Sequence, residues 1–454
     1  MLFFLLGIAI LTAGYFIYGG IVEEVVKPDS RITPAIRHAD GVDFVVLPCW
    51  KNMMIQLLNI AGIGPVIGVI IGIQFGEITF LIIPIGCVIA GAVHDFLAGM
   101  MSLRDNGANL PKIIHDNLGR KFSIIFSWFL VFLLLLVVAV FINIPATLCD
   151  RLILPRFNSF WLFVGLIFLY YIIATLFPID KIIGKIYPFF GILLLIGTFA
   201  LFIVILKQGF ADPLILTESE GFKEHMFTNE NNHPIIPLLF VTIACGILSG
   251  FHATQSPIVA RTMKSEKEAR PTFFAMMIAE GFIAMVWAAV AMIVYNDAPE
   301  LMGKNVQNVV LPKITALLGN GLDIITMTVI VILAVTSGDT VMRSLRLSIS
   351  EMLHIPQKPL LPRILTCLPL IAIVVFLLWW SNLAAKSFGY LWNYFAWSNQ
   401  VIAACTLLAA SVWLFQRGKR MEIALVPGLF ITFIVSTYIC WTNIKFGPPG
   451  LGLP

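Results

Sequence analysis

Hydrophobic residues run along this chain in long continuous stretches separated by short polar segments. The stretch 122–148, for example, contains no Asp, Glu, Lys or Arg. About 20 consecutive apolar residues cross the hydrocarbon core of a bilayer as a helix, whereas a membrane β-barrel needs shorter segments of alternating polarity. The pattern therefore predicts twelve membrane-spanning helices, at 2–18, 48–73, 80–103, 122–148, 157–177, 187–206, 235–260, 272–295, 322–347, 364–380, 388–415 and 423–442.

Composition agrees with this pattern. Of the 454 residues, 59% are hydrophobic and 12% are charged, with a mean hydropathy of +0.95, whereas ordinary soluble domains are roughly a quarter charged. The predicted fold class is therefore all-α, a polytopic membrane protein. The net charge of +4 is small and no basic block is interleaved with aromatic residues, so nucleic acid is not an expected partner. The seven cysteines show no CxxC spacing, which favours buried core residues over disulfides or a zinc site.

Basic residues fall mostly on one side of the predicted topology. Twenty of the 29 Lys and Arg residues lie in or beside the odd-numbered loops, and eight lie in the even-numbered loops and the C-terminal tail. Because cytoplasmic loops retain Lys and Arg, we expect the odd loops inside and both chain termini outside. The sixth loop then lies outside, and its acidic residues are Asp212, Glu218, Glu220, Glu224 and Glu230.

Two predicted spans contain residues that interrupt a helix. The second carries Asn59-Ile-Ala-Gly-Ile-Gly-Pro65, and the seventh carries Gly246-Ile-Leu-Ser-Gly-Phe-His-Ala-Thr-Gln-Ser-Pro257. Glycine relaxes the backbone and proline removes a donor, so each run is expected to unwind at mid-membrane. Unwound backbone there is tolerated only within protein or around a cavity. For Gly68 and Gly72, close helix packing of the GxxxG kind is the alternative.

The two broken spans are five spans apart, which is the spacing of an inverted repeat. An odd offset makes the second copy cross the membrane in the opposite direction, as in secondary transporters with discontinuous helices around a midplane site. We therefore expect one transport domain over 1–454 with a five-plus-five inverted repeat. Its parts are an extra N-terminal helix and cytoplasmic loop (1–47), a first repeat (48–206), an extracellular loop (207–234), a second repeat (235–415), and a C-terminal helix and tail (416–454).

The predicted substrate site lies where the two breaks meet. Free N–H groups and positive dipole ends of the half-helices favour an anionic group such as a carboxylate. Gly64 and Gly250 are expected to line the cavity, so that a bulky side chain at either position would abolish binding without removing the protein from the membrane. The predicted substrate-binding residues are Asn59, Ala61, Gly62, Gly64, Pro65, Ser249, Gly250, His252, Gln255 and Asn393.

Polar groups inside other spans are candidates for binding a coupling ion, because they are costly in a membrane. Oxygens of Thr336-Ser-Gly-Asp-Thr340 could bind a cation, or Asp339 could carry a proton; alternatively Asp339 forms a structural pair with Arg343, four residues away. Adjacent helical residues point about 100° apart, so His94 and Asp95 are expected to pair with neighbouring spans rather than with each other, as a proton relay or as helix contacts. The predicted coupling residues are Thr336, Ser337, Asp339, Thr340, His94 and Asp95, with Glu280 a weaker candidate.

A metal site has little support in the sequence. His38, Asp40 and Asp43 in the first loop are weak candidates, because two carboxylates and one histidine in a loop are more often solvated or capping. No cofactor is expected other than a coupling cation, Na⁺ or H⁺.

Several segments in both halves carry a family resemblance. They are Asp40-Gly-Val-Asp-Phe44, Asn59 to Gly68, Gln74-Phe-Gly76, Gly86 to Arg104, Ser249-Gly-Phe-His252 and Leu391 to Gln400. The chain resembles the carbon starvation protein A family of peptide transporters in the bacterial inner membrane. The resemblance implies uptake of peptides or pyruvate during nutrient limitation, on a fold similar to the amino acid/polyamine/organocation superfamily. The chain departs from the family in being shorter than many members and in carrying Asn52-Met-Met-Ile-Gln56 where a double histidine is common.

Together these features predict a secondary active importer of peptides or of a small carboxylate such as pyruvate. Transport would be coupled to a proton or sodium gradient and proceed by alternating access around a midplane site. The alternatives are a passive channel or facilitator, which needs a continuous polar pore, and a membrane-embedded nutrient sensor. An enzyme is not expected, because the sequence contains no HExxH, GxSxG or CxxC motif. The choice between peptide and carboxylate, and the oligomeric state, are left open by the sequence.

Overall fold

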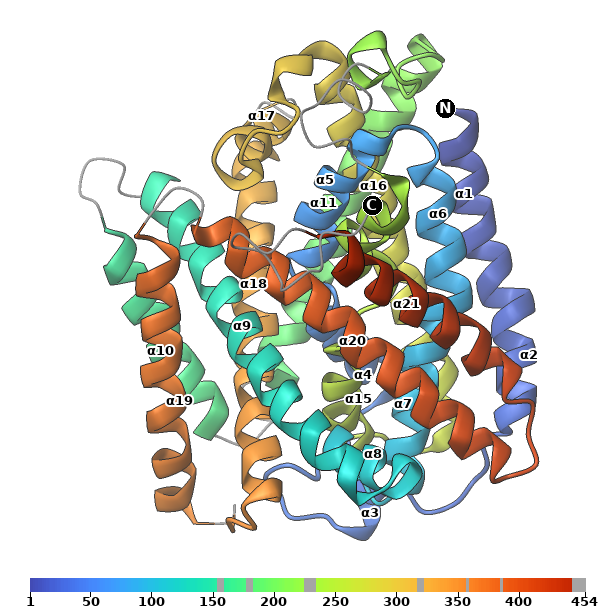
Figure 1. Cartoon of the computed structure of the whole chain (residues 1–454), viewed down its shortest axis with the longest axis vertical. Coiled ribbons are helices and arrows are strands. Elements are labelled where there is room, and N and C mark those ends of the chain that lie inside the picture. The colour runs from blue at the N-terminus through green and yellow to red at the C-terminus, as the bar shows by residue number, and fades with distance from the viewer. Residues whose placement is uncertain are drawn as a thin grey trace.

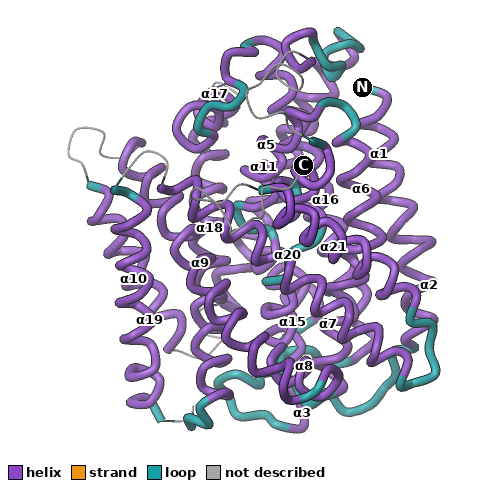
Figure 2. The backbone as a smooth tube through the Cα atoms, in the orientation of Figure 1, coloured by secondary structure: helices purple, strands orange, loops and turns teal. Residues whose placement is uncertain are grey.

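The computed structural model describes residues 1–152, 159–176, 183–223, 234–316, 322–356, 359–383 and 387–442. Within these ranges the chain is built of helices and contains no strand; a single isolated parallel bridge joins Leu47 to Met263. The long helices lie side by side, with short helices and turns gathered at the two ends of the bundle (Figures 1 and 2).

The first part of the chain begins with one membrane span that is built from three consecutive helical pieces. In order, the elements are α1 (Leu2–Ala13), η1 (Gly14–Tyr18), α2 (Gly19–Val26), α3 (Pro34–Arg37), α4 (Cys49–Ile60), α5 (Gly64–Gly72), η2 (Ile73–Phe75), α6 (Thr79–Gly86), η3 (Cys87–Gly91), α7 (Ala92–Arg104), α8 (Leu110–Leu118), α9 (Arg120–Leu152), α10 (Phe160–Leu176) and α11 (Ile183–Ala211).

The second part opens with the more strongly bent of the two broken spans. Its elements are η4 (Ile235–Leu239), α13 (Phe240–Thr242), α14 (Ala244–Ile247), α15 (His252–Ala260), η5 (Glu266–Glu268), η6 (Arg270–Phe274), α16 (Ala275–Asp297), η7 (Pro299–Leu301), η8 (Val306–Val310), α17 (Leu311–Ala316), α18 (Leu322–Met352), α19 (Leu360–Ser381), α20 (Ser387–Phe415) and α21 (Glu422–Trp441).

Each of the twelve predicted spans is built of helix where the structure describes it, apart from a few residues at the ends of spans and at the breaks of two of them. Nine are helices long and apolar enough to cross a membrane, and α10 is a shorter apolar helix. The other two are pairs of helices bent by 48° and 66°, and they are the second and seventh spans. The sequence prediction of breaks in these two spans is therefore confirmed.

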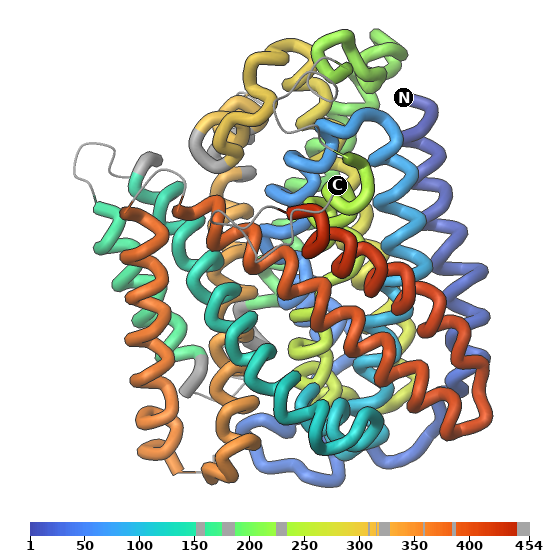
Figure 3. Tube along the Cα trace, in the orientation of Figure 1, coloured from blue at the N-terminus to red at the C-terminus, as the bar shows by residue number. Residues whose placement is uncertain are grey.

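Burial separates the inner helices from the outer ones. Outer helices such as α1, α10, α19 and α21 expose apolar residues, including Leu2, Leu162, Leu361 and Val426, as a lipid-facing surface does. The inner helices pack against partners far away in sequence: α9 against α18, α7 against α15, and α5 against α16. Figure 3 shows α9 and α20, which also pack together, running side by side across the bundle. The two broken spans are thereby enclosed by protein.

Candidate functional site

The first break separates α4 from α5. The N–H of Gly62 turns back to the carbonyl of Ile60 at 2.7 Å, and α5 starts two residues later at Gly64. Pro65 has no N–H, and within the described residues no acceptor is present for the N–H of Ile63 or of Gly64. The first turn of α5 therefore offers free donors at the positive end of a nine-residue helix.

The second break, between α14 and α15, is held by Asn399 of α20. Leu248 has extended backbone (φ −169°, ψ 116°). The backbone carbonyl of Asn399 accepts from the N–H of Gly250 at 3.1 Å, and its side-chain oxygen accepts from the N–H of Phe251 at 2.8 Å. Its amide nitrogen donates to the hydroxyl of Ser249 at 2.6 Å. The donors at the start of α15 are therefore already occupied by protein.

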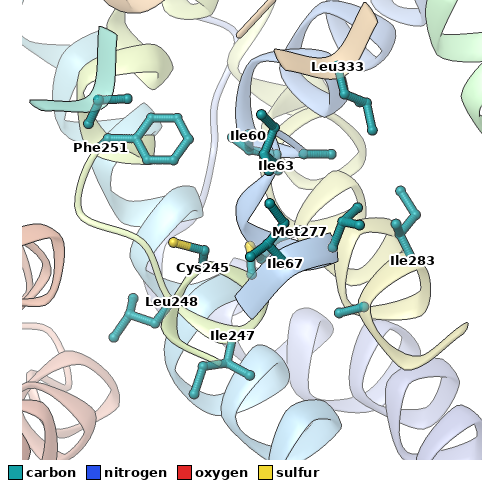
Figure 4. Packing of buried hydrophobic residues seen from close by; sticks show 14 of the residues in the cluster. Ile60, Ile63, Ile67, Cys245, Ile247, Leu248, Phe251, Met277, Ile283 and Leu333 are labelled. Atoms are coloured by element: carbon teal, nitrogen blue, oxygen red, sulfur yellow. The ribbon is translucent and has the colours of Figure 1, made fainter. Parts of the chain in front are cut away.

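The two breaks lie against each other. Figure 4 shows Ile60, Ile63 and Ile67 of the first break facing the segment from Cys245 to Phe251 of the second. The approach is close, because a Cβ added at Gly64 would lie 2.1 Å from the Cβ of Cys245.

This packing corrects one prediction. A Cβ at Gly250 would lie 2.2 Å from the carbonyl oxygen of Asn399, and the Cβ at Gly64 meets Cys245. The expectation that Gly64 and Gly250 line open space is therefore wrong. Both glycines let helical segments approach each other, so a larger residue at either position disturbs packing first.

Two amide side chains of α4 are buried next to the first break. Gln56 and Asn59 are 0% exposed, and within the described residues neither the nitrogen nor the oxygen of either amide has a hydrogen-bond partner. A buried polar group without a partner costs about 1–3 kcal/mol. They lie three residues apart and so share one face of α4. Asn59 was predicted as a site residue; Gln56 was not, although this spacing was visible in the sequence.

The other predicted substrate residues divide into two groups. Ala61, Gly62 and Pro65 are buried in the first break, and Gln255 of α15 donates to the hydroxyl of Thr254 at 2.8 Å. Asn393, in contrast, is exposed on α20.

The amide of α20 that reaches the second break is Asn399, which was not predicted. Six residues turn a helix by about 240°, so Asn393 and Asn399 point in different directions. The signal for Asn399 was the run of three consecutive polar residues, Ser398-Asn-Gln400, in a largely apolar span.

Four ionisable residues from three helices meet beneath the second break, and we call them the Asp95 centre: His94, Asp95, His252 and Glu280. One oxygen of Asp95 lies 2.8 Å from Nδ1 of His94, and the other lies 3.2 Å from Nδ1 of His252. Nε2 of His252 lies 3.7 Å from Oε2 of Glu280. All four side chains are 0% exposed.

The centre corrects the expectation that His94 and Asp95 do not pair. Their Cβ atoms diverge, but Nδ1 is the imidazole nitrogen nearer the backbone and reaches the neighbouring carboxylate. The expected partnership of Asp95 with a neighbouring span is present, since its second oxygen reaches His252 of α15.

A second polar contact joins the first break to α18. The hydroxyl of Ser337 donates to the carbonyl of Leu58 at 2.7 Å. The hydroxyl of Tyr187, from α11, contacts both the carboxylate of Asp339 and the carbonyl of Thr336. Thr336 and Thr340 direct their own hydroxyls to carbonyls of α18. We call Leu58, Tyr187 and residues 336–340 the α18 contact. Tyr187 was not predicted, because nothing in its own span marks it.

The ion-pair partner of Arg343 in this structure is Asp43 of the first loop, at 3.0 Å. Burial raises the pKa of the Asp43 carboxyl, but the charges of Arg343, Arg346 and Arg261 outweigh burial and the net shift is downward. The pair therefore stays charged at neutral pH and ties the loop before α4 to α18. Arg343 also donates to the backbone carbonyl of Ala174, and its pairing with Asp339 stays a prediction.

The first loop does not assemble the weak metal candidate. One oxygen of Asp40 accepts from the N–H groups of residues 42, 43 and 44, and Nε2 of His38 lies 3.4 Å from Asn106. Asp43 is turned to Arg343. Among the described residues, no group of three His, Cys, Asp or Glu is arranged to hold a metal. Capping and ion pairing use these side chains instead.

Comparison with protein families agrees with the motifs and this architecture. The model of the family described as Carbon starvation protein CstA matches residues 1–175, 156–317 and 302–438. The chain belongs to this family. The resemblance predicted from its motifs is therefore confirmed.

Relatives of the chain include an uncharacterized membrane protein and named transporters. An uncharacterized membrane protein of Haemophilus influenzae is 39% identical over 66% of this chain and 93% of its own length. The pyruvate/proton symporter BtsT of Escherichia coli is 26% identical over 60% of this chain and 46% of its own length. The peptide transporter CstA of Campylobacter jejuni is 27% identical over 66% and 52%. The match thus spans about half the length of these two transporters.

Solved structures show the fold class. MhsT in complex with L-phenylalanine has a TM-score of 0.62 at 12% identity, covering 86% of this chain and 99% of that one. A mutant of the Eremococcus coleocola manganese transporter has a TM-score of 0.58 at 14% identity, covering 88% and 90%. The predicted all-α transporter fold, with its repeated broken helices, is therefore confirmed.

Proposed function

We propose that this protein is a secondary active importer of a small carboxylate-bearing nutrient, pyruvate or a short peptide, bound between the two helix breaks. The observation that carries the proposal is the first break, where Gln56 and Asn59 are buried without partners beside the free N–H groups of Ile63 and Gly64. The names of the relatives, a pyruvate/proton symporter and peptide transporters, support this class of substrate.

The chemistry of the first break suits a carboxylate. Amide nitrogens and backbone N–H groups donate hydrogen bonds to carboxylate oxygens, and the positive end of the α5 dipole adds attraction. The amide oxygens of Gln56 and Asn59 remain as acceptors for a substrate amide or ammonium group. Binding of substrate would therefore satisfy groups that the protein leaves unpaired.

Uptake into proteoliposomes tests this function. We expect accumulation of labelled pyruvate or dialanine above the outside concentration when a proton or sodium gradient is imposed, and none in protein-free vesicles. Asn59→Ala should lower uptake, whereas the matched control Asn393→Ala, an exposed amide, should not. Equilibration without accumulation under either gradient would indicate a passive facilitator and contradict the proposal.

We further propose that a hard coupling cation would bind at the α18 contact. Carbonyl and hydroxyl oxygens of Leu58 and Ser337 meet there, and the carboxylate of Asp339 adds negative charge two residues further along α18. Asp339→Asn should abolish sodium-driven accumulation while leaving substrate exchange partly intact. Normal sodium-driven accumulation by this variant would leave Asp339 a structural partner of Tyr187.

The orientation in the bacterial inner membrane is proposed from the charge bias of the loops, with both termini outside. The short helices α3 and α8, which belong to odd loops, lie at the end of the bundle opposite the N-terminus (Figure 1). Single cysteines in a cysteine-free variant test this. An impermeant thiol reagent added outside should label the sixth loop at the exposed position Glu220 and spare the seventh at Lys267; the reverse result would invert the topology.

A further inference from the structure

The Asp95 centre joins the second break to two helices that do not break. His252 is the first residue of α15, Asp95 and His94 lie on α7, and Glu280 lies on α16. α7 belongs to the third span and α16 to the eighth, so the two carboxylates occupy spans five apart, as the two breaks do. Any displacement of α15 relative to α7 or α16 changes the distances from His252 to both carboxylates.

The hydrogen bonds of the centre define where a proton can sit. Nδ1 of His94 lies next to one oxygen of Asp95, and Nδ1 of His252 lies next to the other. In the assignment that satisfies both contacts, each imidazole donates an N–H to the ionised carboxylate of Asp95. This assignment leaves Nε2 of His252 facing Oε2 of Glu280 at 3.7 Å. If neither atom carries a proton, a lone pair faces a carboxylate in the buried interior of the protein. One proton, on Nε2 or on Glu280, removes this repulsion.

Apart from the backbone carbonyl of Ile60, which approaches the imidazole of His252, the surroundings of the centre provide little other compensation. The ion pairs of Asp95 and Glu280 among the described residues are all with His94 or His252. In the described ranges, the other titratable groups that face the centre are thiols: Cys87 of η3, which donates to the carbonyl of Met277, and Cys245 of α14. Neither oxygen of Glu280 has a hydrogen-bond partner in the described part of the chain. An ionised Glu280 without a proton on His252 would be an uncompensated buried charge, which is expensive.

We propose that the proton driving transport binds in the Asp95 centre, shared between Nε2 of His252 and Glu280. The proton reaches one of these two atoms from the outside solution and leaves it to the inside solution, and no other group changes its bonding. With the proton bound, α15 stays against α7 and α16, as in this structure. After its release the facing lone pairs favour separation of His252 from Glu280, which moves the wall of the substrate site. This inference rests on the proposed transport function and names its coupling group.

Infrared titration of the purified full chain tests proton binding without any substrate. A buried protonated carboxyl gives a C=O band that disappears as the pH rises. We expect Glu280→Gln to remove this band, whereas Glu220→Gln, an exposed acid paired with Lys223, should leave it in place. Gln has nearly the shape of Glu and breaks no hydrogen bond here, so folding should survive; Glu280→Asp, which keeps the acid, gives a second variant that should retain the band. A band that persists in Glu280→Gln overturns the assignment.

Transport assays then distinguish a failure of this inference from a failure of the proposed transport function. With pyruvate or dialanine as the probe, Glu280→Gln should lose about tenfold or more of proton-driven accumulation, while exchange of substrate at equal concentrations continues and loses its dependence on pH. If the parent transports neither probe, the proposed function fails while the infrared result stands. If the parent is proton-driven and Glu280→Gln is equally so, the Asp95 centre is structural and the inference fails.

Discussion

The two helix breaks differ in how their polar groups are satisfied. In the second break, Asn399 occupies the N–H groups of Gly250 and Phe251 and the hydroxyl of Ser249. In the first break, Gln56 and Asn59 are buried with no protein partner in the described ranges. Both halves therefore contain an interrupted helix. We call the second break closed, because Asn399 occupies its polar groups, and the first break open, because the amides of Gln56 and Asn59 have no partner in the described ranges.

The difference suggests that the second break serves mainly structural stability and the first serves mainly substrate binding. A break in which Asn399 occupies the N–H groups of Gly250 and Phe251 is expected to hold its shape and to transmit a displacement through His252, whereas a break with unpaired amide side chains is expected to gain most from a ligand. Groups that cost stability in the absence of substrate are expected where binding energy is needed. Substitutions at the closed break should therefore lower stability, and substitutions at the open break should lower binding.

The largest effect is expected for Gly250→Ala in the closed break. The added Cβ would lie 2.2 Å from the carbonyl oxygen of Asn399 and 2.6 Å from the backbone nitrogen of Ala403. Both atoms belong to the backbone of α20 and cannot turn away, so overpacking should cost about 3 kcal/mol or more. Thermal unfolding in detergent should show a marked fall in Tm or no folded protein at all. An unchanged Tm would mean that α20 does not hold the break.

Gly64→Ala should also be destabilising, but a second substitution at Cys245 should restore part of the lost stability. Its Cβ would meet the Cβ and Sγ of Cys245 at 2.1 and 2.8 Å, and the nearest backbone atom, the Cα of Cys245, is 3.5 Å away. The double variant Gly64→Ala/Cys245→Gly should therefore recover about half or more of the lost stability. Gly250→Ala combined with Cys245→Gly is the matched control and should recover nothing. Equal behaviour of the two pairs would show that the close approach of the breaks is not as described.

Asn399→Ala should be intermediate. It leaves the N–H of Phe251 and the hydroxyl of Ser249 buried without partners, at an expected cost of about 2–4 kcal/mol for the two groups. Asn393→Ala, an exposed amide on the same helix, should change the free energy of unfolding by less than about 0.5 kcal/mol. The comparison of the breaks would lose its basis if both alanine variants unfolded alike.

Asn59→Ala tests the open break, where stability and function should separate. No hydrogen bond within the described protein is lost, so the free energy of unfolding should change by less than about 1 kcal/mol. Substrate affinity should fall about tenfold, equivalent to about 1.4 kcal/mol for one hydrogen bond to a charged ligand. Scintillation proximity binding of labelled pyruvate or dialanine measures it. A stability loss as large as that of Asn399→Ala would show that Asn59 has a structural partner.

The smallest effect is expected for Ser337→Ala. It removes one hydrogen bond to the carbonyl of Leu58, at a cost of about 0.5–1.5 kcal/mol. Any sodium dependence of uptake should weaken, while proton-driven uptake should persist, because the Asp95 centre is untouched. If Ser337→Ala lost both proton-driven uptake and sodium dependence, the two ions would share one site, which contradicts the two separate sites proposed here.

Much of the fold could be predicted because the residues of each span carry the signal for that span. A run of apolar residues without charge must be helical in a bilayer, since backbone groups there need partners within the segment. Glycine and proline likewise act where they stand, so the breaks near Gly62 and Gly250 were visible. The five-span offset between them then specified the repeat.

The site could be predicted only in part, because its residues are selected by rotation and packing. Asn393 was chosen for the site and is exposed, whereas Asn399, six residues later, closes the second break. Glu280 was ranked below His94 and Asp95, yet it completes the centre with them. A polar residue in an apolar run shows that a partner is needed but not which helix supplies it.

The sequence by itself therefore determined the membrane class, the twelve spans, the two breaks and the family, because hydrophobicity and backbone chemistry act over short stretches of chain. Only the tertiary structure decided that one break is closed by Asn399 and the other left open, that His252 lies between Asp95 and Glu280, and that Arg343 pairs with Asp43, 300 residues away. These are contacts between helices, and their partners depend on helix rotation and on close approach at glycines, which no local pattern encodes.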